Sequence, residues 1–104
     1  MRAMFTKRNC PYCREVISAV TRLNSILPFG EKIPIINVES SDSRLRFLKN
    51  VFGDAVKTPC LVIDKKYVSA DLGRYAVKMT DNVFVFSMLD REHMYELLNV
   101  LSAR

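Results

Sequence analysis

The sequence contains one histidine and three cysteines, and it has no long run of apolar residues. Because a helix that crosses a membrane needs about 20 consecutive apolar residues, we expect no such helix. The first residues, MRAMFTKRN, include no apolar segment of the ~7–15 residues that a secretory signal peptide requires. We therefore expect a cytoplasmic protein with reduced thiols, which excludes a secreted domain held together by a disulfide framework.

Internal repeats, low-complexity tracts and linkers are also lacking. A chain of 104 residues is long enough for one hydrophobic core and too short for two, so residues 1–104 predict a single domain. The net charge of +5 comes from residues 1–52, which hold nine Lys or Arg and four Asp or Glu, whereas residues 53–104 hold seven of each. Because the basic residues are not interleaved with aromatic ones, we expect no nucleic-acid partner. We also expect a monomer without a membrane partner.

The first half of the chain alternates between strand and helix patterns. Residues 2–6 and 33–38 predict two short strands. Between them a helix is predicted from Pro11 until Pro28 and Gly30 end it. Its apolar residues recur at helical spacing: Val16, Ile17, Val20, Leu23 and Leu27.

A second helix is predicted after the run SSDS at residues 40–43, whose side chains can cap its first turn. Gly53 ends this helix, and its apolar face is Leu45, Leu48 and Phe52. Residues 57–64 and 82–88 then predict a third and a fourth strand. Asp90 is expected to cap a last helix, whose inner face is Met94, Leu97, Leu98 and Leu101.

The order βαβα followed by ββα is typical of an α/β fold. We expect a central mixed sheet of four strands flanked by three helices, with the first two strands parallel and the last two antiparallel. Residues 65–81 are too many for a hairpin loop and predict a structured insertion, with residues 75–79 as a candidate fifth strand. The predicted core includes Met4, Phe5, Phe47, Phe52, Phe84 and Phe86.

The stretch KRNCPYCRE, residues 7–15, holds two of the three cysteines at a predicted junction of strand and helix. Cys10 directly precedes the helix, so its sulfur should face unpaired backbone N–H groups and the positive end of the helix dipole. Both stabilise the thiolate, as do the nearby cations Lys7, Arg8 and Arg14. Cys13 lies in the first turn on the same side, where it can attack a mixed disulfide formed on Cys10. The spacing therefore predicts an attacking and a resolving thiol.

Two other interpretations of the cysteines carry less weight. A zinc site needs four ligands, and beyond the pair the chain offers only Cys60 and His93, which we expect to be an exposed helical residue. A purely structural pair does not account for proline and tyrosine between the cysteines at such a junction. Two interpretations of Cys60 remain open: its sulfur is packed in a buried strand, or it is a third thiol near the redox pair.

The motif K-x-x-C-P-Y-C of residues 7–13 resembles the active site of dithiol glutaredoxins, members of the thioredoxin superfamily. Thr58-Pro59 resembles the cis-proline loop of that superfamily, which lies beside the redox pair. Residues 86–101, FSMLDREHMYELLNVL, resemble its last strand edge and closing helix. The resemblance implies a glutaredoxin-like fold over residues 1–104, leaving the 65–81 insertion outside the family pattern. We expect this insertion to protect the sheet edge, away from Cys10 and Cys13.

The resemblance implies a thiol–disulfide oxidoreductase that reduces protein or glutathione mixed disulfides through Cys10 and Cys13. It implies no tightly bound cofactor or metal, with glutathione as co-substrate and glutathione or a reductase as electron donor. Substrate or glutathione would be bound by Lys7, Tyr12, Thr58, Pro59 and Asp90, with the Tyr12 ring exposed. The alternatives are an iron–sulfur cluster carrier, which Pro11 disfavours, and a non-catalytic binding module, which the intact cysteine pair disfavours.

Two departures from the family pattern concern glutathione binding. Glutaredoxins usually carry Gly-Gly followed by Asp before the last helix, where this chain has Ser87 and Met88, with Asp90 nearby. Asp90 therefore has a competing role as a plain N-cap. The chain also has Thr58-Pro59-Cys60 where glutaredoxins more often have Thr-Val-Pro.

Overall fold

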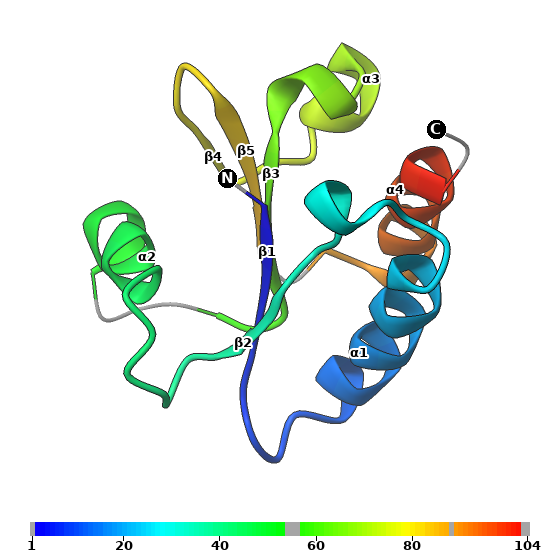
Figure 1. The fold of residues 1–104 in the computed structure, drawn as a ribbon. Coiled ribbons are helices and arrows are strands. Elements are labelled where there is room, and N and C mark those ends of the chain that lie inside the picture. Colours follow the sequence, from blue (N-terminus) through cyan, green and yellow to red (C-terminus); the bar gives the residue numbers. More distant parts are fainter. Residues whose placement is uncertain (1, 54–56, 88, 103–104) are drawn as a thin grey trace.

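The strands of the described residues form one mixed sheet in the order β2-β1-β3-β5-β4 (Figure 1). The structure is a computed structural model that describes residues 2–53, 57–87 and 89–102. Its strands are β1 (Ala3–Thr6), β2 (Ile35–Asn37), β3 (Cys60–Asp64), β4 (Lys78–Met79) and β5 (Val83–Ser87). The β1–β2 pair is parallel and the β3–β5 pair is antiparallel, which confirms both predictions. β4 pairs antiparallel with β5 and is the fifth strand predicted within the insertion.

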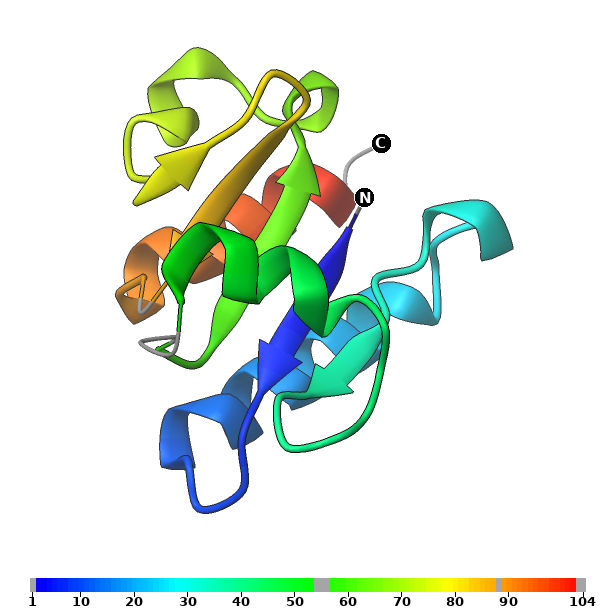
Figure 2. The same cartoon turned by 90° about the vertical axis from the view of Figure 1, so that its left-hand side faces the viewer.

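Helices cover both faces of this sheet (Figures 1 and 2). The described residues form α1 (Pro11–Asn24), α2 (Leu45–Phe52), α3 (Ala70–Gly73) and α4 (Arg91–Ser102), with 3₁₀ turns at Phe29–Glu31 and Lys65–Tyr67. α1 and α4 lie on one face and α2 lies on the other. α1, α2 and α4 are the three predicted helices, and the short α3 belongs to the insertion. None of the described helices is long and apolar enough to cross a membrane.

The core is divided by the sheet into two clusters, because successive strand side chains point to opposite faces. Met4, Phe84 and Phe86 are buried on the face covered by α1 and α4, and Phe5 is buried on the α2 face. These four residues confirm the predicted core. Phe47 is only partly buried at the rim of the α2 cluster, and the side chain of Phe52 lies outside the described part of the chain.

The end of α1 differs from the prediction. The helix ends at Asn24 and not at Pro28, because the Asn24 side chain is engaged by the chain that returns to the sheet. Its amide donates to the carbonyl of Ile33 over 2.8 Å and accepts from the Ile33 N–H over 2.7 Å. Leu27 lies beyond the helix end and is nevertheless buried. The predicted apolar stripe was correct, and its last member reaches the core from a turn.

The cap of α2 was predicted wrongly. Arg44 is its N-cap residue and provides no capping side chain, so the run at residues 40–43 does not cap the helix. Asp42 instead accepts from both the backbone N–H and the guanidinium of Arg44, each over 2.9 Å. The end of α2 follows the prediction: Gly53 has φ 64°, which an L side chain rarely adopts.

The insertion, residues 65–81, is folded onto the rest of the domain. Val68 and Leu72 are buried in the α1/α4-side cluster. Gly73 lies so close to the ring of Phe84 that an added Cβ would come within 2.5 Å of its Cζ atom. In Figure 1, α3 lies at the end of the sheet opposite to the start of α1. The insertion therefore covers one end of the sheet and extends its edge through β4.

Candidate functional site

The turn between β1 and α1 determines where the first cysteine lies. Asn9 has φ 58°, a left-handed conformation that asparagine tolerates better than most residues. The chain then becomes extended at Cys10, which is the N-cap residue of α1, with Pro11 in the first helical position. The predicted placement of the motif at a strand-to-helix junction is thus confirmed.

Cys10 and Cys13 are joined as a disulfide, with their Cα atoms 5.1 Å apart. The backbone N–H of Cys13 donates to the Sγ atom of Cys10 over 3.2 Å. Cys10 is partly exposed, whereas Cys13 is 1% exposed. An incoming sulfur can therefore reach Cys10 and not Cys13. In any exchange reaction, Cys10 would be the sulfur that contacts the substrate.

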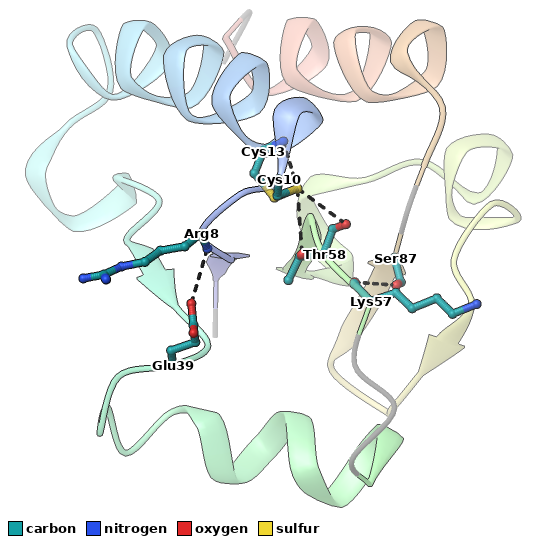
Figure 3. Close-up of a disulfide and its surroundings, with 7 residues drawn as sticks. All are labelled: Arg8, Cys10, Cys13, Glu39, Lys57, Thr58 and Ser87. Atoms are coloured by element: carbon teal, nitrogen blue, oxygen red, sulfur yellow. Dashed lines mark hydrogen bonds between the residues drawn. A yellow bond between two sulfur atoms is a disulfide. The ribbon is translucent and has the colours of Figure 1, made fainter.

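The loop before β3 forms one flank of the disulfide (Figure 3). The Thr58-Pro59 peptide bond is cis, as the resemblance to the superfamily predicts. The Oγ1 atom of Thr58 lies 3.9 Å from Cys10 Sγ, and its carbonyl oxygen lies 4.0 Å from the same sulfur. The hydroxyl of Ser87 donates to the carbonyl of Lys57 over 2.8 Å and so ties β5 to this loop. Thr58 and Pro59 are therefore beside the cysteine pair, as expected.

A groove of about 340 Å³ forms the other flank of the disulfide. Both cysteines line it, together with Lys7, Arg8, Arg14 and Asn37. The three cations are exposed. In Figure 3 the Arg8 side chain extends away from the disulfide, while its backbone N–H donates to Glu39 Oε1 over 3.4 Å. The predicted positive surroundings are present, but the Arg8 guanidinium is directed away from the disulfide.

Tyr12 is not the exposed ring that the sequence suggested. It is partly buried against the α1/α4-side cluster, and its hydroxyl is buried without a hydrogen-bond partner among the described residues. Burial raises the pKa of this hydroxyl, and the positive charge of Arg91 acts in the opposite direction. The guanidinium carbon of Arg91 lies 4.9 Å from the ring centroid, and its Nε donates to Glu15 Oε2 over 2.6 Å. The ring is partly buried because, from the start of α1, it packs against the start of α4 at Arg91.

The pairing of Arg91 with Glu15 was not foreseen from the sequence. The two residues are 76 positions apart, and no local pattern connects them. Both side chains are partly solvent-exposed, so the ion pair contributes little stability by itself. Together with the Tyr12 contact, it links the first turn of α4 to the cysteine-bearing turn of α1.

Asp90 is the N-cap of α4, as predicted. Its Oδ1 accepts from the backbone N–H of His93 over 2.9 Å, and its Oδ2 lies 2.5 Å from His93 Nδ1. These two hydrogen bonds hold the pKa of Asp90 below its usual range. The carboxylate therefore already has a protein partner.

His93 was predicted to be exposed, but it is partly buried. The Tyr75 ring of the insertion packs against it, with the ring centroids 4.0 Å apart. The α3 part of the insertion lies at the end of the sheet away from Cys10 and Cys13, as expected, and its Tyr75 ring contacts the residue that binds Asp90. No local sequence pattern predicts this contact either. Met88, which occupies part of the usual Gly-Gly position, lies outside the described residues.

Cys60 is a free thiol and is completely buried. It belongs to the α2-side cluster with Phe5 and Leu48. Burial raises the pKa of this thiol to about 12. The structure therefore supports the interpretation of Cys60 as a packed sulfur. Across the described ranges, no three His, Cys, Asp or Glu residues gather in a group that could hold a metal ion.

The fold and the cysteine pair define a thioredoxin-like α/β protein with a redox-capable dithiol. Residues 3–68 match the family model of glutaredoxin. The chain belongs to the glutaredoxin family, and it has a thiol-redox function. Searches of curated proteins and of solved structures found no match. The matched region contains both cysteines and the cis-proline loop, whereas Asp90 lies beyond it.

Cys60 should be inert in the folded protein. At neutral pH a thiol with a pKa of about 12 has about three thousandfold less thiolate than a free cysteine with a pKa of about 8.5, and the buried sulfur offers no access to a reagent. We expect iodoacetamide to label Cys10 in the reduced native protein and to label Cys60 only after urea unfolding. Mass spectrometry of the labelled peptides measures this for each cysteine separately, because the buried Cys13 also becomes accessible on unfolding. Cys60→Ala is the control that loses the urea-dependent label on the Cys60 peptide. Labelling of Cys60 at the rate of Cys10 under native conditions would contradict the packed position.

Two substitutions of Asp90 separate its capping role from ligand binding. Asparagine caps helices about as well as aspartate and alanine does not, so Asp90→Ala should lower the melting temperature by a few degrees and Asp90→Asn should lower it less. Because the folded pKa of Asp90 is lowered, its stabilising effect is present above the unfolded pKa and is lost as the pH falls. If the carboxylate binds glutathione, both variants should slow reduction of a glutathione mixed disulfide equally. A slower reaction in Asp90→Ala alone would mean that Asp90 is only a cap.

Proposed function

We propose that this protein is a thiol–disulfide oxidoreductase that reduces disulfides of proteins and mixed disulfides with glutathione. The observation that carries the proposal is the arrangement of the two sulfurs: Cys10 is accessible at a helix N-terminus, and Cys13 is buried within bonding distance of it. Membership of the glutaredoxin family supports the same chemistry. No tightly bound cofactor is needed for this reaction.

Reduction would proceed in two exchange steps. The Cys10 thiolate attacks one sulfur of the substrate disulfide, so that a Cys10–substrate bond forms and the other substrate sulfur leaves as a thiolate. Cys13 then loses its proton and attacks Cys10 Sγ, which forms the Cys10–Cys13 disulfide and releases the second substrate thiolate. The two released thiolates take up protons, and two electrons have passed from the protein to the substrate. The disulfide in this structure is the product state of that sequence.

Glutathione is proposed as the co-substrate and as the donor that restores the reduced pair, with a reductase as the other possible donor. The cis-proline loop supports this, because the backbone of Thr58 lies beside the sulfur to which a substrate cysteine would be joined. Lys7 lines the groove next to Cys10 and is proposed to bind a substrate carboxylate. Pro59 would shape the cysteine subsite and Asp90 would bind an amine. Tyr12 would act by packing α1 against α4, since its ring is partly buried.

Substitution of each cysteine tests these roles. Cys10→Ser should abolish exchange with every disulfide, because the accessible nucleophile is lost. Cys13→Ser should retain attack by Cys10 and accumulate a mixed disulfide that cannot be resolved internally. The measurements are the rate of reduction of a disulfide peptide and of a glutathionylated peptide, with mass spectrometry of the trapped species. Equal and mild losses in the two variants would show that the pair does not catalyse the reaction.

A further inference from the structure

The two flanks of the disulfide differ in character. On one side lies the cis-proline loop, where Thr58 approaches Cys10 with its hydroxyl and carbonyl oxygens. On the other side lies the groove lined by Lys7, Arg8 and Arg14. A disulfide substrate has two halves, one joined to Cys10 and one that leaves, and both extend from the reacting sulfurs. The groove is therefore available to a segment of substrate that the cis-proline loop does not contact.

A second hollow continues this groove toward α2. It also has a volume of about 340 Å³, and it shares Lys7 with the groove at the disulfide. Lys49 of α2 lines its far part, together with the apolar side chains of Val38, Leu45 and Leu48. We call the two hollows together the basic track. An extended chain rises about 3.3 Å per residue, so a track that joins two such hollows accommodates several residues of a peptide.

The charge of the basic track is strongly unbalanced. Four cations line it, namely Lys7, Arg8, Arg14 and Lys49. The one acidic side chain among its described lining residues is Glu39, which accepts a hydrogen bond from the backbone of Arg8. The structure records no ion pair for the four cations within the described residues, and all four are exposed. Their positive charge is therefore available to a ligand.

We propose that the basic track binds an acidic segment of the protein substrate, next to the cysteine that reacts with Cys10. This inference rests on the proposed function and adds the substrate class: a disulfide flanked by Asp or Glu residues. Charge complementarity supports it, because carboxylates are the natural partners of exposed Lys and Arg side chains. The apolar residues of the second hollow would contact the aliphatic parts of the side chains in the same segment. Arg8, whose side chain extends away from the disulfide, would act on the segment and not on the sulfurs.

The test compares matched disulfide peptides that carry three Glu, three Gln or three Lys residues beside the reactive cysteine. The measured quantity is kcat/KM for each peptide, and the ratio of the Glu to the Gln peptide reports on the basic track. This ratio is independent of the intrinsic reactivity of Cys10. We expect a preference of about five- to tenfold for the Glu peptide at low salt, from several exposed ion pairs. It should fall toward unity near 1 M salt, where the screening length is about 3 Å.

Charge reversals locate the preference on the surface. Arg8→Glu should remove most of the preference for the Glu over the Gln peptide. Because this preference is a ratio, any effect of the lost cation on the reactivity of Cys10 cancels. Lys49→Glu should have the same effect only with a peptide whose acidic tail is long enough to reach α2. The matched control is Lys78→Glu on the exposed β4 strand, which makes the same change in net charge and should retain the preference.

Separate outcomes distinguish a failure of this inference from a failure of the proposed function. If wild-type protein reduces none of the peptides, the proposed function is wrong, and the inference falls with it. If it reduces the Glu and Gln peptides equally well, or if Lys78→Glu acts as strongly as Arg8→Glu, the track has no role. If Arg8→Glu slows reduction of glutathione disulfide as much as that of the Glu peptide, with both rates taken relative to the Gln peptide, the groove is a glutathione subsite and the inference is wrong.

Discussion

The backbone N–H of Cys13 donates a hydrogen bond to the sulfur of Cys10, and this contact gives Cys10 two roles. As the N-cap of α1, its sulfur accepts from an N–H group that would otherwise have no partner in the helix. As a redox sulfur, it lies where those N–H groups and the helix dipole favour negative charge. The cap that begins the helix is therefore also the group that reacts, and the surrounding structure is arranged to keep it in place.

The scaffold achieves this with buried strands on both sides of the cysteine turn. All four residues of β1 are buried, and β1 pairs with β2 and with β3, so the turn that leads to Cys10 starts from a fixed point. β3 begins directly after the cis-proline, and its first residue, Cys60, is completely buried. The two loops that meet at the disulfide thus emerge from neighbouring strands of one sheet. Cys10 and Thr58 are 48 residues apart in the sequence, and the β1–β3 pairing brings them together in space.

Local patterns were sufficient to predict the elements and the cysteine pair. The spacing of apolar residues predicted the main helices and strands, and the C-P-Y-C motif predicted that Cys10 lies at the start of a helix. Both predictions succeeded because these features depend on residues that are close together in the sequence. The predicted cap of α2 failed locally, because Asp42 accepts from Arg44, but the other failed predictions concern groups that are distant in the sequence. Asn24 ends α1 through hydrogen bonds to Ile33, and Tyr12 is partly buried because it packs beneath Arg91. The contact of Tyr75 with His93 likewise joins segments that no sequence period relates.

The central claim is that the start of α1 activates the accessible sulfur. The direct test is a pH titration of the Cys10 thiolate in the reduced Cys13→Ser variant, followed by thiolate absorbance or by the rate of alkylation. The buried Cys60 does not titrate in the same range, because its pKa is raised to about 12. The account predicts that the pKa of Cys10 lies clearly below the value of ~8.5 for a free cysteine. A pKa at or above that value would contradict it.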